Sequence, residues 1–168
     1  MNYVTLTLVA LAGLLGDCAH VQIRHVTEGV CAISLPASWK REEVQGIDSR
    51  LVRYRGDGFL CEIEFGIHLG REKIEIEKLR QRYAQVGSSR PGESIIRVGQ
   101  RLGEIMTDNG DQNVEYVGLR HDTLLYVPTE HGYVTVRIFY RDPSERSVAL
   151  RILKSVTIQE ELTRRVAH

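Results

Sequence analysis

The chain of 168 residues has little of what marks the specialised classes of protein. Three cysteines are too few for a small disulfide scaffold, and four prolines without a proline-rich tract exclude a collagen-like or rigid stalk. Basic and acidic residues balance at 22 each, so bulk charge does not indicate a nucleic-acid-binding protein. The charged fraction of 26% and the apolar fraction of 42% are typical of a globular chain, and the length suits one domain.

An uncharged, apolar run covers residues 3–16, close to the N-terminus. It is shorter than the roughly 20 residues that a membrane-spanning helix needs. Its length fits the apolar core of a secretory signal peptide. The run leads directly into the tetrapeptide Leu15-Gly16-Asp17-Cys18.

This tetrapeptide resembles the lipobox of bacterial lipoproteins, in which the cysteine sulfur receives a diacylglycerol and becomes the first residue of the mature chain. The resemblance implies a signal peptide at residues 1–17, lipidation of Cys18 and a linker at residues 18–27. Two features depart from the pattern: Asp17 replaces a small residue, and no Lys or Arg precedes the apolar run. Soluble export with cleavage near residues 10–12 and a helix buried in a cytosolic protein remain as alternatives.

The two other cysteines lie in segments that alternate with a period of two. Cys31 shares its parity with Ile33 and Leu35, and Cys61 shares its parity with Ile63. This alternation predicts two strands with both thiols on the core face. If the strands are neighbours and the protein is exported, we expect a Cys31–Cys61 disulfide; the alternative is two free, buried thiols.

Short strands alternate with two helices along the rest of the chain. The first helix is predicted at residues 72–86, from apolar side chains at helical spacing. The second begins at Asp142, with Pro143 and Glu145 completing a capping-box pattern. Strands are expected at residues 30–35, 50–54, 59–66, 94–98, 103–107, 114–119, 123–127 and 133–140.

This order predicts an α+β domain at residues 28–158, in which two main helices pack on an antiparallel sheet, followed by a flexible tail at residues 159–168. The segments 31–39 and 152–156 resemble the opening strand with its Pro-x-x-Trp corner and the closing turn of PsbP-like and Mog-type proteins. That resemblance implies an α/β/α sandwich without common catalytic residues. Trp39 and Ser155 match positions of the pattern that look structural.

Recognisable catalytic and metal-binding patterns do not occur. The six histidines show no paired metal-ligand spacing, and Gly-x-Ser-x-Gly is absent. Residues 108–113 are rich in Asp and Asn but do not match a calcium-binding EF-hand, so we interpret them as a turn. Pairings of His121-Asp122 with Glu130-His131 are interpreted as loop polar residues. We expect no metal and no cofactor.

A charged hairpin is the best candidate for a binding surface. Residues 55–58 supply a turn between two strands, and both strands carry charges that can pair across them. The candidate surface consists of Arg50, Arg53, Arg55, Glu62 and Glu64. Glu62 and Glu64 also match, by type, the carboxylate pair of glycosidases, although that chemistry needs carboxylates that flank a cleft.

The sequence therefore favours a non-catalytic lipoprotein on the periplasmic face of a bacterial membrane. Its expected partner is a protein of the cell envelope. It acts either as an immunity protein against an envelope-targeting toxin or as an accessory subunit of an envelope complex. The alternative is a small envelope hydrolase or metal-dependent enzyme whose site has no recognisable motif.

Overall fold

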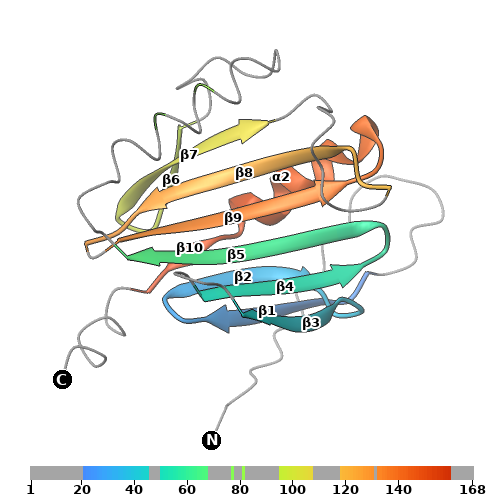
Figure 1. Ribbon diagram of the computed structural model, residues 1–168, viewed down its shortest axis with the longest axis horizontal. Coiled ribbons are helices and arrows are strands. Elements are labelled where there is room, and N and C mark those ends of the chain that lie inside the picture. The colour runs from blue at the N-terminus through green and yellow to red at the C-terminus, as the bar shows by residue number, and fades with distance from the viewer. Residues whose placement is uncertain are drawn as a thin grey trace, which may run out of the picture.

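The computed structural model describes residues 21–45, 50–67, 77, 81, 95–107, 118–130 and 132–159. Within these ranges the chain is mostly strand, arranged in two antiparallel sheets, and the longest helical segment spans only residues 143–154 (Figure 1). The predicted α+β fold with two main helices on one sheet is therefore wrong, and so is the α/β/α sandwich that the resemblance implied. The main sheet packs against a second, smaller sheet together with the helical segment at residues 143–154.

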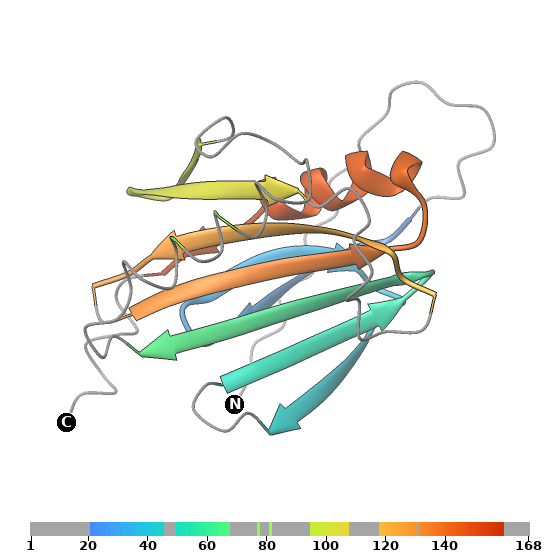
Figure 2. The same cartoon turned by 45° about the horizontal axis from the view of Figure 1, so that its top comes forward.

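The larger sheet has seven strands, and every neighbouring pair is antiparallel. It places strands that are distant in sequence side by side, because β9 lies between β5 and β8. Its two outer strands among the described residues are β3 and β6 (Figure 2). In spatial order the strands are β3 (Lys40–Gln45), β4 (Arg50–Gly56), β5 (Phe59–Ile67), β9 (Gly132–Tyr140), β8 (His121–Pro128), β7 (Arg101–Thr107) and β6 (Ile95–Val98).

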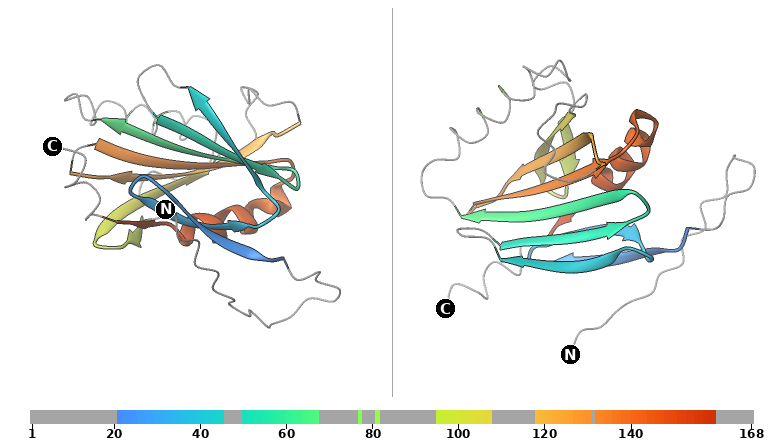
Figure 3. Two further views of the ribbon diagram at one scale, coloured as in Figure 1. Left: turned by 90° about the horizontal axis from the view of Figure 1, so that it is seen from below. Right: turned by 45° about the vertical axis from the view of Figure 1, so that its right-hand side comes forward.

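The smaller sheet pairs the start of the domain with its end. Strand β2 (Cys31–Pro36) lies between β1 (Ile23–Glu28) and the two-residue β10 (Thr157–Ile158). The small sheet and helix α2 (Arg146–Lys154) lie together on one face of the large sheet (Figure 3). We call that face the inner face and the opposite one the outer face.

The main core fills the space behind the inner face. Period-two alternation sends Val52 and Tyr54 from β4 and Cys61 and Ile63 from β5 into it. Side chains of the small sheet and of α2 meet them, with Leu35 and Leu153 fully buried. A second, smaller apolar cluster lies on the outer face and contains Met106, Leu124, Tyr126 and Tyr133.

The turn between β4 and β5 fixes the register of the candidate hairpin. Asp57 and Gly58 both have positive φ angles, 53° and 80°, which is the requirement of the tight two-residue turn that matches strand twist. Gly56 precedes this turn and lies against the ring of Trp39, where a Cβ atom would come within 2.5 Å of a ring carbon. Trp39 is buried and stacks on Phe59, with ring centroids 5.6 Å apart.

The capping box before the second predicted helix is confirmed. The Asp142 side chain accepts a hydrogen bond from the Ser144 backbone, and the Glu145 side chain accepts one from the Asp142 backbone. A 3-10 turn, η1 (Pro143–Glu145), leads into α2. At the other end, Ser155 donates to the Ile152 carbonyl at 2.6 Å and accepts from the Ser34 backbone at 3.0 Å, in keeping with its expected structural role.

Strands were predicted correctly at residues 30–35, 50–54, 59–66, 94–98, 103–107, 123–127 and 133–140, while β1, β3 and β10 were missed. Strand β1 occupies the second half of the expected linker at residues 18–27. Of the predicted helix at residues 72–86 only Glu77 and Gln81 are described, both helical. Residues 1–20, 108–117 and 160–168 lie outside the described ranges, and with them Cys18, the predicted turn at 108–113, most of the predicted strand at 114–119 and nearly all of the predicted tail.

Candidate functional site

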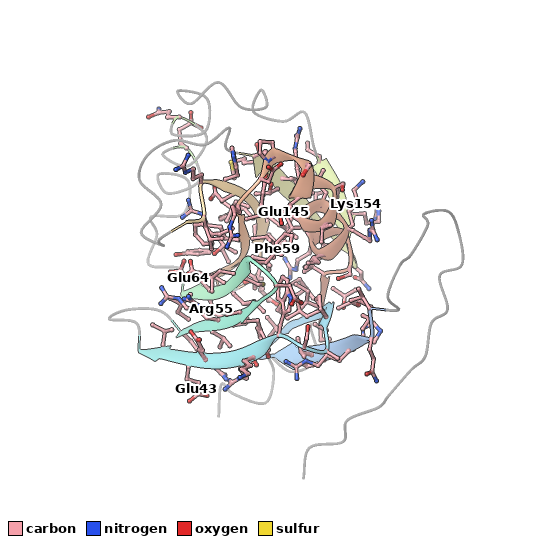
Figure 4. All side chains as sticks on the ribbon, turned by 90° about the vertical axis from the view of Figure 1, so that its right-hand side faces the viewer. Glu43, Arg55, Phe59, Glu64, Glu145 and Lys154 are labelled. Atoms are coloured by element: carbon pink, nitrogen blue, oxygen red, sulfur yellow. The ribbon has the colours of Figure 1, made fainter. Side chains whose placement is uncertain are left out.

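The β4–β5 hairpin brings four of the five predicted surface residues to the outer face. Arg53 pairs directly with Glu62, and Leu51 pairs with Glu64, in the register of the two strands. Arg55 has the same parity as Arg53 and therefore shares its face. In Figure 4, Arg55 and Glu64 lie on the side of the large sheet that faces away from α2, whose Lys154 lies on the opposite side.

Arg50 does not belong to this group. It has the parity of Val52 and Tyr54, so its side chain lies on the inner side of the sheet, where a guanidinium nitrogen comes 3.5 Å from a carboxylate oxygen of Glu28. The predicted surface is therefore divided between the two faces of β4. Strand parity alone places Arg50 on the other face from Arg53 and Arg55. The prediction was wrong because it grouped these residues by their charge.

On the outer face, charges of alternating sign form one row across four strands. The register aligns Glu42 of β3, Arg53 of β4, Glu62 of β5 and Arg137 of β9. We call these four residues the charged row. Arg53 and Glu62 form an ion pair at 2.7 Å, with side chains 22% and 14% exposed.

The charged row continues toward β8 through Arg137. Its guanidinium forms an ion pair with the fully buried Asp122 and lies over the ring of Phe139, 4.5 Å from the ring centroid. Beside the row, Glu64 accepts a hydrogen bond from Thr135 at 3.5 Å. Glu62 and Glu64 thus share a strand face, but Glu62 is held by Arg53, so this geometry does not present a glycosidase-like carboxylate pair.

At its β3 end the charged row reaches solvent. Arg55 and Glu42 lie 3.7 Å apart with side chains 53% and 46% exposed, and Glu43 points away from the sheet at this edge (Figure 4). Lys40, from the same strand, is also exposed. We call this exposed set the β3 rim, and it consists of Lys40, Glu42, Glu43 and Arg55. Sequence reasoning missed its β3 members because Lys-Arg-Glu-Glu carries no apolar alternation.

A second group of charges joins the two sheets on the inner face. Glu28, at the end of β1, accepts hydrogen bonds from the Tyr54 hydroxyl at 2.6 Å and from two guanidinium nitrogens of Arg41 at 2.6 and 3.1 Å. Arg50 adds the contact at 3.5 Å, and Arg41 also reaches Glu43. We call Glu28 with Arg41, Arg50 and Tyr54 the Glu28 network.

The Glu28 network keeps its carboxylate charged although it is buried. Burial has the largest influence and would raise the pKa of Glu28, but hydrogen bonds from Arg41 and Tyr54, together with the charges of Arg41 and Arg50, bring that pKa below its ordinary value. Burial and the same carboxylate raise the pKa of Tyr54. The hydrogen bond to Glu28 raises the pKa of Arg41. Each of the three groups therefore stays in the protonation state that its hydrogen bond requires. We interpret the Glu28 network as a contact that stabilises the fold.

The predicted disulfide is not formed. Cys31 and Cys61 are free, fully buried thiols. They lie on the core faces of their strands, as predicted, but β2 and β5 belong to different sheets, so they are not the neighbouring strands that the prediction required. Burial, followed by the charge of Glu28, raises the pKa of Cys31 to about 12, and burial is also the largest cause of the raised pKa of Cys61. Such thiols are poor nucleophiles.

The other candidate metal and polar sites that the sequence suggested are not assembled among the described residues. They contain no group of three or more His, Cys, Asp or Glu side chains placed to hold a metal ion. His121 stacks on Tyr140, with ring centroids 5.7 Å apart, while His131 and residues 108–113 lie outside the described ranges. No helix in the described part of the chain has the length and apolar character needed to cross a bilayer.

Comparison with known proteins gives no family to which the chain can be assigned. No protein-family model matches its sequence, and no characterised protein matches it either.

Proposed function

We propose that this chain is an exported, lipid-anchored, non-catalytic protein-binding domain, and that the β3 rim binds its partner. The partner is a protein of the bacterial envelope: either a toxin against which the chain gives immunity, or a subunit of a resident complex. The observation that carries the proposal is that the β3 rim exposes side chains of both signs of charge at the edge of the large sheet, whereas Glu62 and Asp122 on the outer face are held in largely buried ion pairs.

Exposure separates the charges that maintain the fold from those that are available to a partner. Asp122 is fully buried and Glu62 is 14% exposed, whereas Arg55 and Glu43 are 53% and 75% exposed. Exposed pairs contribute little to stability. Complementary charges across an interface do, however, steer association and select the partner.

The anchor belongs to the same proposal. Only Ala19 and His20 lie between Cys18 and Val21, where the described domain begins. Three residues of extended chain span at most roughly 10 Å, so a lipidated Cys18 would hold the start of β1 close to the membrane surface. A partner of such a domain has to be a component of the envelope or has to cross it.

The β3 rim is tested by photo-crosslinking in a Gram-negative host. A photoreactive amino acid is placed at Lys40 or Arg55, and at Lys154 on α2 as a matched exposed control (Figure 4). The expected result is one discrete adduct at positions 40 and 55 that disappears at high salt, with none at 154. The same adducts at all three positions, or none at any, would contradict the proposal. If the adduct forms only when a competing strain is added, the partner is a toxin and not a subunit of a resident complex.

The anchor is tested separately by intact mass and fractionation, with and without globomycin, an inhibitor of lipoprotein signal peptidase. A membrane-bound species that begins at a diacylated Cys18 without the inhibitor, and is replaced by a diacylated precursor that still carries residues 1–17 with it, supports the anchor. A Cys18→Ala chain should leave the membrane fraction. A species that still begins at Met1, without lipid, would remove the anchor from the proposal and leave the binding surface to be judged alone.

A further inference from the structure

Strand β6 has backbone groups with which no other described strand pairs, on the side of the large sheet opposite the β3 rim. It forms a two-residue hairpin with β7, in which Val98 pairs with Arg101 and Ile96 with Gly103. The closing pair of such a hairpin is hydrogen-bonded, and hydrogen-bonded pairs alternate with non-bonded ones. The N–H and C=O groups of Ile95 and Arg97 therefore point away from β7, and no described strand pairs with β6 on that side.

The side chains at this edge are apolar, in contrast to those of β3. Ile95 and Leu102 are 59% and 58% exposed, the largest such values for leucine or isoleucine among the described residues. Ile96 is half-buried and packs against the main core. Arg97, the single charged residue of β6, lies opposite Leu102. Natural sheets often protect an outer strand with several charges, as β3 does, whereas the short strand β6 has Arg97 alone.

We propose that β6 pairs with β6 of a second copy of this chain, antiparallel about a two-fold axis through Ile96. This register brings Ile95 opposite Arg97 of the second copy and Arg97 opposite its Ile95, so all outward-pointing backbone groups find partners. Ile96 meets its own copy at the axis. The two large sheets then continue as one. The inference does not depend on the β3 rim or on the anchor.

The side chains fit this register on both faces of the joined sheet. On the outer face, the aliphatic part of Arg97 lies between Leu102 of its own hairpin and Ile95 of the second copy, which covers both exposed apolar residues. On the inner face, the two Ile96 side chains form a direct non-hydrogen-bonded pair, the arrangement with the closest side chains. Arg97 does not lie directly opposite its own copy, so the register avoids a direct pairing of like charges.

The test measures the mass in solution of the full chain carrying Cys18→Ser, so that no lipid mediates association. Sedimentation at increasing concentration is expected to approach twice the monomer mass. Arg97→Pro removes an N–H that points outward, a position at which an outer strand tolerates proline, and is expected to give a monomer with unchanged circular dichroism. Arg97→Ala keeps the N–H and is expected to remain a dimer.

Three outcomes would overturn the inference. These are a monomer at every concentration, a dimer that survives Arg97→Pro, or a monomer with both variants, since the last would mean that the arginine side chain and not the strand edge makes the contact. Ile96→Cys gives an independent reading if the proline variant fails to fold. Mild oxidation should cross-link it across the axis within minutes, whereas Arg97→Cys, displaced by the register, should cross-link at least tenfold more slowly.

Discussion

The two faces of strand β4 carry the same kinds of side chain in very different surroundings. On the inner face, the Glu28 carboxylate is 7% exposed and is held by a tyrosine and two arginines. On the outer face, Arg53 pairs with a glutamate that is 14% exposed, and Arg55 with one that is 46% exposed. Arginines of β4 thus contact three carboxylates whose exposure increases from 7% to 14% and 46%. We call this series the gradient.

This gradient separates a structural role from a binding role. A buried carboxylate that loses its partners keeps the full cost of desolvation, so the Glu28 network is costly to break. An exposed pair exchanges its contacts for water at little cost and is available to a partner. The predictions below test the gradient from its buried end to its exposed end.

The largest effect is expected from Glu28→Gln. The substitution removes the charge that Arg41 and Arg50 contact and leaves Tyr54 with a weaker acceptor, so we expect a loss of about 2–4 kcal/mol in the free energy of unfolding. Urea denaturation followed by circular dichroism measures it. Glu43→Gln, at a side chain 75% exposed and also in contact with Arg41, is the matched control and should stay within about 0.5 kcal/mol. Equal losses for the two variants would contradict the gradient.

The same carboxylate predicts a pH dependence. Because the pKa of Glu28 is lowered in the folded state, its contribution is present above the ordinary value of 4.5 and is lost as the pH falls through the folded-state value. Stability of the unmodified protein should therefore fall more steeply below about pH 4.5 than that of Glu28→Gln. Unfolding free energies from pH 7 to pH 3 provide the comparison. Parallel curves would show that Glu28 is not a source of the acid sensitivity.

A smaller effect is expected in the middle of the gradient, at Arg53 and Glu62. A double-mutant cycle with Arg53→Ala and Glu62→Ala should give a coupling free energy of about 0.5–1 kcal/mol, because the pair is direct but partly hydrated. The Glu42–Arg55 pair, longer and more exposed, should give less than about 0.5 kcal/mol in the same experiment. The reverse order would mean that exposure does not set the strength of these pairs.

Local patterns predicted the hairpin at the centre of this site. Alternation at residues 59–66 and the turn chemistry at Asp57-Gly58 are properties of neighbouring residues, and both were confirmed. The capping box at Asp142 was predicted for the same reason. The alternation of residues 50–54 also places Arg50 on the opposite face from Leu51 and Arg53. The prediction did not use this alternation, because it grouped Arg50 with the other residues by charge.

The fold class could not be obtained this way, because it depends on distant partners. Strand β3 reads Lys-Arg-Glu-Glu-Val-Gln, which as an outer strand needs no apolar face of its own, and β10 has only two residues. Arg137 joins the charged row because β9 pairs with β5, more than seventy residues away in the sequence. The placement of β2 and β5 in different sheets, so that Cys31 and Cys61 do not lie on neighbouring strands, is likewise a property of topology.

The exposed end of the gradient predicts little change in stability and a large change in binding. Exchanging the two charges, Glu42→Arg with Arg55→Glu, keeps their mutual pair and reverses what a partner meets at the β3 rim, but also places an arginine opposite Arg53. The free energy of unfolding should therefore fall by no more than about 1 kcal/mol, the usual cost of like charges directly opposite on a sheet. Affinity for the partner captured at positions 40 and 55 should fall at least tenfold, mainly through slower association at low salt. An Ile95→Asp chain, altered at the opposite edge, should bind that partner normally; the opposite pattern would move the binding surface from β3 to β6.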